Sequence, residues 1–195
     1  MFAPFSKQAK TWECQALVLR GHLNLAIHEM LDPFELAEKV GLLLVDARAI
    51  CADLDEDVAA EVLHRSKDAW SGGVYAQPLP TGQLICILNP THPERRRKVT
   101  LMEEISHIHL KHLPTGLRTV GSGLRVRDFN AKQEAEAYGV GSAALLPWGA
   151  FFHDVNNGMA VDLIAEKYQV STELVAYRIK ISGAYKLYMA RQRAA

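Results

Sequence analysis

The chain has 195 residues, of which 49% are hydrophobic and 8% are aromatic. A chain of this length and composition can bury a substantial core, which excludes a disordered protein and indicates a globular one. Its 22 basic residues balance 22 acidic residues, so there is no net charge to attract nucleic acid or an anionic membrane. Binding of that kind would need a local patch.

No apolar run is long enough to span a bilayer, and the start of the chain lacks the charged and apolar regions of a signal peptide. We therefore expect a cytoplasmic protein. The cysteines Cys14, Cys51 and Cys86 are odd in number and scattered, which favours neither a disulfide framework nor a thiolate zinc site. We interpret them as small buried apolar residues.

The N-terminal part of the chain predicts two helices and a strand. Residues 8–30 have the apolar pattern of a helix with a break near Gly21. Asp32 as the N-cap and Gly41 as the terminator frame a second, short helix. The apolar run 42–45 that follows predicts a buried strand.

The next segment predicts a helix and then a β-hairpin. Residues 53–66 begin with acidic side chains, as the first turn of a helix often does. Residues 73–78 and 83–88 flank the turn-forming tetrad 79–82, so we expect paired strands of which the second is central and apolar. The proline-rich segment 89–93 ends that strand and precedes another helix.

That helix contains the most informative motif of the chain, Glu103-Glu104-x-x-His107. Residues four apart lie on the same face of a helix, so Glu103 and His107 can bind one metal ion, with Glu104 beside them. This is the geometry of the zincin helix, in which two ligands at i and i+4 hold zinc and the intervening glutamate is a general base. The usual first ligand is histidine, whereas this chain has glutamate.

The other side chains of this helix have less specific roles. Leu101, Ile105 and Ile108 form an apolar face that we expect to point toward the core. His109 and His112 are three residues apart and are predicted to point elsewhere, as exposed or capping residues near the end of the helix.

A connecting loop and a long helix are predicted next. Residues 113–123 are rich in glycine and proline and are interpreted as a loop. Asp128 is the predicted N-cap of a helix that stops at Pro147 and has small residues suited to close packing. Its acidic residues Glu134 and Glu136 can present a third carboxylate to the motif helix.

The C-terminal segment has the spacing of a helix-turn-helix. Two short amphipathic helices surround residues 169–171, with Ser171 as the N-cap of the second. The second helix offers Arg178 and Lys180 as basic groups and begins near Glu173, which is a poor surface for phosphates. We therefore interpret the segment as a packing unit that can also hold a protein partner, rather than as a DNA-binding module.

In their order along the chain, these pieces resemble the ImmA/IrrE-type metallopeptidases of bacteria and phages. The resemblance rests on the short helix and strand of residues 32–45, on Asn89-Pro90 with His92-Pro93 before the motif helix, on residues 134–147 and on the closing segment 164–179. It implies an α+β fold: a helix-rich zincin-like metallopeptidase domain with a small β-sheet, in residues 1–157. Residues 158–195 would be a C-terminal helix-turn-helix-like segment packed on it.

The resemblance also implies a zinc-dependent endopeptidase whose usual target is a helix-turn-helix repressor. Carried over by position, the metal ligands are Glu103, His107 and Glu134, and the catalytic general base is Glu104. Glu134 is favoured as the third ligand because Tyr138, four residues later, would be its neighbour, and Glu136 is the alternative. We expect a protein partner, such as a repressor encoded nearby, and neither membrane association nor direct nucleic-acid binding.

The glutamate at position 103 leaves three possibilities open. The enzyme works with an altered metal site; another histidine, such as His112 or His92, completes a site of different geometry; or the site is inactive and the fold serves as a protein-binding anti-repressor. Two carboxylates and one imidazole neutralise more of the metal's charge than two imidazoles and one carboxylate. Such a ligand set suits Mn²⁺ or Fe²⁺ as well as Zn²⁺.

Overall fold

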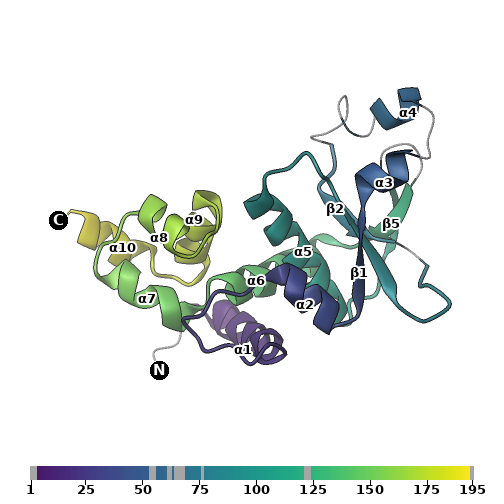
Figure 1. Ribbon diagram of the computed structural model, residues 1–195. Helices are drawn as coiled ribbons and strands as arrows, with labels where there is room; N and C mark the ends of the chain where they lie inside the picture. The colour runs from purple at the N-terminus through teal and green to yellow at the C-terminus, as the bar shows by residue number, and fades with distance from the viewer. Residues whose placement is uncertain are drawn as a thin grey trace. The chain divides into compact units, whose positions relative to one another are not determined.

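The structure is a computed structural model that describes residues 4–52, 56–60, 63, 69–75, 77–120 and 124–193. The chain forms two compact units, Asp32–Ala137 and Met1–Leu31 with Tyr138–Ala195. The predicted boundary after residue 157 lies inside the second unit, and a division at that point stays a prediction. Helices predominate and the strands form small sheets (Figure 1), which confirms the predicted helix-rich α+β class.

The unit Asp32–Ala137 contains a three-stranded sheet of order β1-β3-β2. Strand β3 (Leu84–Leu88) pairs in parallel with β1 (Leu42–Asp46) and antiparallel with β2 (Gly72–Val74). The predicted antiparallel pairing, with an apolar and central second strand, is therefore confirmed, although β2 ends at Val74 and not at the predicted residue 78. The prediction that residues 42–45 are buried is wrong in part, because β1 is an edge strand and Leu43 is 42% exposed.

In the described part of this unit, three helices precede the motif helix. The predicted helix caps around α2 (Pro33–Lys39) are confirmed: Asp32 accepts a hydrogen bond from the Phe34 backbone N–H, and Gly41 has a positive φ of 74°. Helix α3 (Ala47–Ala52) was not predicted. Helix α4 (Glu56–Ala60) falls within the predicted helix 53–66, of which residues 53–55, 61–62 and 64–66 lie outside the described part.

Helix α5 (Glu94–His109) packs against β2 and β3 and carries the Glu-Glu-x-x-His motif. The segment after it is not the predicted loop, because β4 (Gly116–Val120) and β5 (Leu124–Asp128) form an antiparallel pair. Val126 of β5 is 1% exposed and belongs to the apolar cluster of this unit, close to Gly73 of β2. A short strand with one buried face and polar residues on the other gives only a weak sequence signal for a strand, and the glycines nearby obscure it.

The second unit is helical. Helix α1 (Lys7–Gly21) ends where the break was predicted, but the remainder of the predicted helix 8–30 is not helical. Instead the chain turns back, and the buried Arg20 guanidinium donates hydrogen bonds to the carbonyl oxygens of Ala26 and Glu29. These bonds satisfy backbone acceptors that a continued helix would have used.

The C-terminal segment consists of short helices, as predicted. Helix α8 (Val161–Lys167) and helix α9 (Thr172–Ile181) pack together, and Ser171 caps α9 by accepting a hydrogen bond from the Leu174 N–H. They follow α7 (Trp148–Asn156) and precede α10 (Tyr185–Gln192). The aromatic residues that follow Pro147 form a packed group with Phe5 rather than an exposed platform: Trp148, Phe151 and Phe152.

A buried ion pair joins α9 to α1. Arg178 is fully buried, pairs with Glu13 and donates a hydrogen bond of 3.0 Å to the Leu146 carbonyl oxygen. Glu13 also accepts a hydrogen bond from the Trp148 N–H, and burial raises the pKa of its carboxyl against the opposing field of Arg178. Arg178 is thus part of the packed interior of this unit.

Two simpler expectations have mixed outcomes. No helix in the described part of the chain is long and apolar enough to cross a membrane. Cys86 is buried in β3, as predicted, but Cys14 is exposed on α1. The side chain of Cys51 lies outside the description.

Helix α6 (Ala131–Leu145) carries residues of both units, and its small residues allow the close packing that was predicted. A Cβ atom at Gly139 would overlap the ring of Trp12, which is itself 4% exposed. We expect Gly139→Ala to lower the free energy of unfolding by about 1–3 kcal/mol, the usual cost of overpacking a core.

Urea denaturation followed by circular dichroism measures this change. Gly21→Ala is the matched control, since nothing lies within 4 Å of a Cβ atom there. The control should be neutral or stabilising by up to about 1 kcal/mol. Equal stability of the two variants would contradict the close packing.

Candidate metal centre

The turn before α5 is fixed by a buried asparagine. Asn89 follows β3 and is 0% exposed; its amide nitrogen donates to the Trp70 carbonyl oxygen, at 2.9 Å. Its side-chain oxygen accepts hydrogen bonds from the backbone N–H of Thr91, at 3.0 Å, and from the Thr91 hydroxyl, at 2.7 Å. One side chain thus ties the turn before α5 to the segment before β2, and Trp70 of that segment lines the cavity of the candidate site.

The burial pattern of α5 orients its functional residues. Leu101 and Ile105 are fully buried, as predicted, and so is Met102, which the sequence reasoning did not single out. Glu103 and Glu104 are half-buried, whereas His107 is 3% exposed. The apolar face therefore seats the helix, and the motif residues lie at its edge.

The first turn of α6 brings a third acidic side chain to this edge. The helix begins at Ala131 with Asn130 as its cap: the Asn130 side-chain oxygen accepts from the N–H groups of Lys132 and Gln133, and Gln133 accepts in return from the Asn130 N–H. This is a reciprocal capping box. The prediction of Asp128 as the cap is wrong, because Asp128 is the last residue of β5.

The helices bring together the candidate ligands that the sequence predicted. One possible ligand atom from each of Glu103, His107 and Glu134 lies within 4.8 Å of the others. The Nε2 atom of His107 is 3.6 Å from a carboxylate oxygen of Glu134. Atoms that share an ion at about 2.1 Å lie roughly 3 to 4 Å apart, so small side-chain movements would close this set around a metal. The donors present therefore fit a divalent ion.

These side chains border a cavity of about 260 Å³. Glu104 lines it beside Glu103, and Arg127 and Phe129 line it from the end of the β4–β5 pair. Burial together with the negative charge of Glu104 raises the pKa of the Cys86 thiol well above its usual range. The Glu104 carboxylate therefore lies within electrostatic range of the sheet and also faces the cavity.

The sequence reasoning missed the aromatic neighbour of His107. The Phe129 ring stacks on the His107 imidazole with a centroid distance of 3.8 Å and an interplanar angle of 17°. Phe129 lies between β5, which was not predicted, and α6. The alternation of apolar and polar residues in 124–128 is the sequence signal that could have predicted β5.

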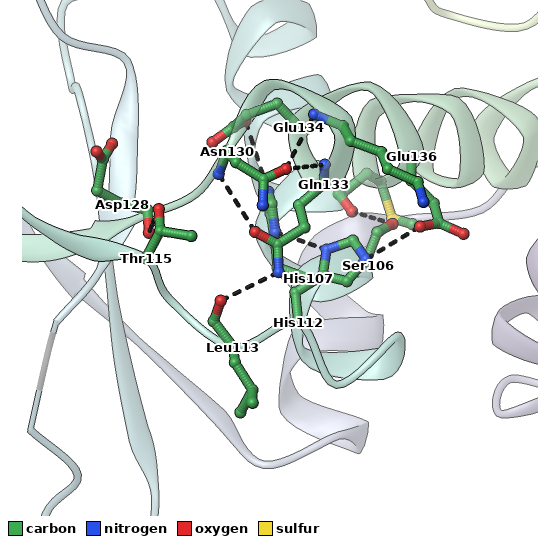
Figure 2. A network of polar contacts seen from close by, with 12 residues as sticks. Ser106, His107, His112, Leu113, Thr115, Asp128, Asn130, Gln133, Glu134 and Glu136 are labelled. Carbon is green, nitrogen blue, oxygen red and sulfur yellow. Dashed lines mark hydrogen bonds and ion pairs between the residues drawn. The ribbon is translucent and has the colours of Figure 1, made fainter.

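The prediction that His112 points away from the site is wrong. Its Nδ1 atom lies 3.0 Å from Nδ1 of His107, and its Nε2 atom lies 3.4 Å from a carboxylate oxygen of Glu136; Figure 2 shows both contacts. The helix has already ended there, because Lys111 has a positive φ of 56° and turns the chain back. Burial and the nearby His107 lower the pKa of His112.

The alternatives considered for the ligand set lie in different places. Glu136 contacts His112 and is outside the group of Glu103, His107 and Glu134. His92 is buried, at 6% exposed, and is also outside that group. Tyr138, expected beside Glu134, packs its ring edge-to-face against Tyr177.

The fold and this site define a class of protein: a helix-rich α+β domain with two acidic residues and a histidine on one helix and a further carboxylate on a later helix. The family model of the IrrE N-terminal-like domain, Peptidase M78, matches residues 56–180. The chain belongs to this family of metal-dependent peptidases, which confirms the resemblance found in the sequence. No curated protein matches the chain.

The cap of α6 should control the position of Glu134. We expect Asn130→Ala to lower the free energy of unfolding by about 1 kcal/mol, because two N–H groups at the helix start lose their acceptor. Asn130→Asp keeps an acceptor at the same place and should retain most of the stability. Thermal unfolding of the three proteins measures the difference, and equal loss in both variants would contradict the role of the cap.

Proposed function

We propose that the protein is a metal-dependent endopeptidase in which Glu103, His107 and Glu134 bind the metal ion and Glu104 is the general base. The observation that carries the proposal is the convergence of the three ligand atoms within 4.8 Å, beside a cavity that Glu104 also lines. Membership of the Peptidase M78 family supports the same reaction class.

The reaction we propose is hydrolysis of a peptide bond. A bound divalent ion lowers the pKa of water toward neutrality and polarises a carbonyl group. Glu104 accepts a proton from the attacking water and donates it to the leaving amine, as a general base and then a general acid. Glu104 is placed for this role because its side chain lines the same cavity as Glu103.

The metal we propose is Zn²⁺, with Mn²⁺ or Fe²⁺ as alternatives. Carboxylate oxygens are ligands that suit Mn²⁺, imidazole is a ligand of both Zn²⁺ and Fe²⁺, and two of the three donors here are carboxylates. Glu103 thus replaces an imidazole without removing a ligand. We therefore favour an active site with an altered metal preference.

The substrate we propose is a helix-turn-helix transcriptional repressor, whose cleavage would release the genes it controls. The support is the resemblance of the chain to the ImmA/IrrE-type peptidases. Direct DNA binding has less support, because the buried Arg178 leaves Lys180 as the basic residue that α9 can offer to phosphates. We place the protein in the cytoplasm, where such a repressor acts.

Metal content tests the ligand set. We expect near-stoichiometric metal, measured by mass spectrometry, in the purified parent chain and loss of most of it in Glu103→Ala, His107→Ala and Glu134→Ala, because each removes one donor of three. His28→Ala and Glu38→Ala, at exposed positions, are the matched controls and should retain metal. A folded parent chain that stays metal-free under varied metal supply would contradict the metal centre.

Glu104→Gln separates catalysis from metal binding. The variant should keep its metal but cleave roughly 10²- to 10⁴-fold more slowly, since an amide cannot accept the proton. The measurement is the appearance of new N-termini in source cells that express the parent chain, Glu104→Gln or the control Glu38→Gln.

New termini inside a helix-turn-helix repressor that depend on Glu104 would support both the activity and the substrate. Termini in another protein would retain the peptidase and replace the substrate. Relief of repression by Glu104→Gln as strong as by the parent chain would instead establish a non-catalytic anti-repressor.

A further inference from the structure

Behind His107 the structure has two polar contacts in series. The first joins Nδ1 of His107 to Nδ1 of His112, at 3.0 Å, and the second joins Nε2 of His112 to Glu136, at 3.4 Å. Figure 2 shows His112 between the other two side chains. The opposite nitrogen of His107, Nε2, faces Glu134 at 3.6 Å, on the side of the candidate metal ligands.

The chemistry of the end group sets the direction of these hydrogen bonds. An ionised carboxylate is an acceptor alone, so Glu136 requires a proton on Nε2 of His112. A neutral imidazole has one N–H, and the Nδ1 atom of His112 is then an acceptor. Nδ1 of His107 must therefore donate, which leaves the Nε2 atom of His107 with its lone pair directed toward Glu134.

The surroundings of the two rings favour a fixed arrangement. The side chains of His107 and His112 are 4% and 9% exposed, so little water competes for these bonds. Phe129 stacks on the His107 ring and limits its rotation. The His112 backbone N–H also donates to the His107 carbonyl oxygen, at 3.0 Å, so the two residues are held together twice.

We propose that His112 and Glu136 are positioning residues that hold His107 in the tautomer with its proton on Nδ1, so that Nε2 is ready to bind metal. Metal-binding histidines commonly donate their second ring N–H to a carboxylate or a carbonyl group. Here a histidine takes that place and a carboxylate orients it in turn. The inference rests on the proposed metal centre and assigns Glu136 a role other than that of ligand.

The test compares substitutions that keep or remove the acceptor at position 112. His112→Phe keeps a ring of similar size and removes both nitrogens. His112→Asn keeps an acceptor at the position of Nδ1, and Glu136→Ala removes the group that orients the ring. His28→Asn and Glu38→Ala, at exposed positions, are the matched controls.

The first readout is the tautomer of His107 in the metal-free full chain, from long-range proton–nitrogen NMR spectra at a pH where the imidazoles are neutral. We expect the Nδ1–H form in the parent chain, a mixture with the Nε2–H form in His112→Phe, and recovery in His112→Asn. A role limited to packing would leave the tautomer unchanged, so this readout separates positioning from structure.

The second readout is the zinc dissociation constant, from competition with a chelator. We expect it to rise roughly 10- to 100-fold in His112→Phe, the usual effect of losing a partner of a ligating histidine. It should rise less in His112→Asn and Glu136→Ala, since the acceptor remains in both. A loss of binding in Glu136→Ala as complete as in Glu134→Ala would overturn the inference, because Glu136 would then be a ligand.

The two readouts distinguish failure of this inference from failure of the proposed function. If the parent chain binds none of Zn²⁺, Mn²⁺ and Fe²⁺, the metal centre fails, and the tautomer spectra still decide whether His112 and Glu136 orient His107. If the parent chain binds zinc and the His107 tautomer is the same in His112→Phe, the inference is wrong and the metal centre stands.

Discussion

The site depends on the packing of α5 against the three-stranded sheet. Leu101, Met102 and Ile105 are at most 1% exposed, so the helix has one rotational setting that buries them. Rotating it by one residue, about 100°, would expose this apolar face and carry the motif away from the cavity. Hydrophobic burial, which has no chemical specificity of its own, thus fixes the direction of three residues that do: Glu103, Glu104 and His107.

In the helical unit, the corresponding structural constraint is a buried ion pair. Arg178 and Glu13 are far apart in sequence, and leaving either charge buried without its partner would cost about 3–5 kcal/mol. The pair ties α9 to α1 and keeps the Arg178 guanidinium away from the surface of a segment with helix-turn-helix spacing. Spacing predicted the two helices, but the fate of the basic side chain depended on a partner at the opposite end of the chain.

Local sequence signals predicted some elements of the fold, whereas contacts between distant residues did not show in the sequence. Elements with strong local signals were predicted well, including the Asp32 and Gly41 caps, the apolar β3 and the i, i+4 pair on α5. The β4–β5 pair was missed because its pattern is short and lies among glycines. Helical geometry placed His112 away from the site, whereas the positive φ at Lys111 ends the helix first and returns His112 toward His107. A non-glycine residue in this conformation gives little signal in a sequence.

The charges around the cavity favour a cation there. Glu103, Glu104 and Glu134 line it together with Arg127, which leaves two negative charges in excess among these four residues. Carboxylates about 4.8 Å apart, the separation limit of the ligand atoms, repel each other by roughly 3 kcal/mol at an effective dielectric constant of about 20. A divalent cation would turn this repulsion into attraction. The glutamate at position 103 adds negative charge where the usual histidine would be neutral, so it would strengthen the electrostatic attraction for a metal and would lower the acidity of a bound metal. In such a ligand set His107 would be the one imidazole, and its orientation would matter more than in a site with two.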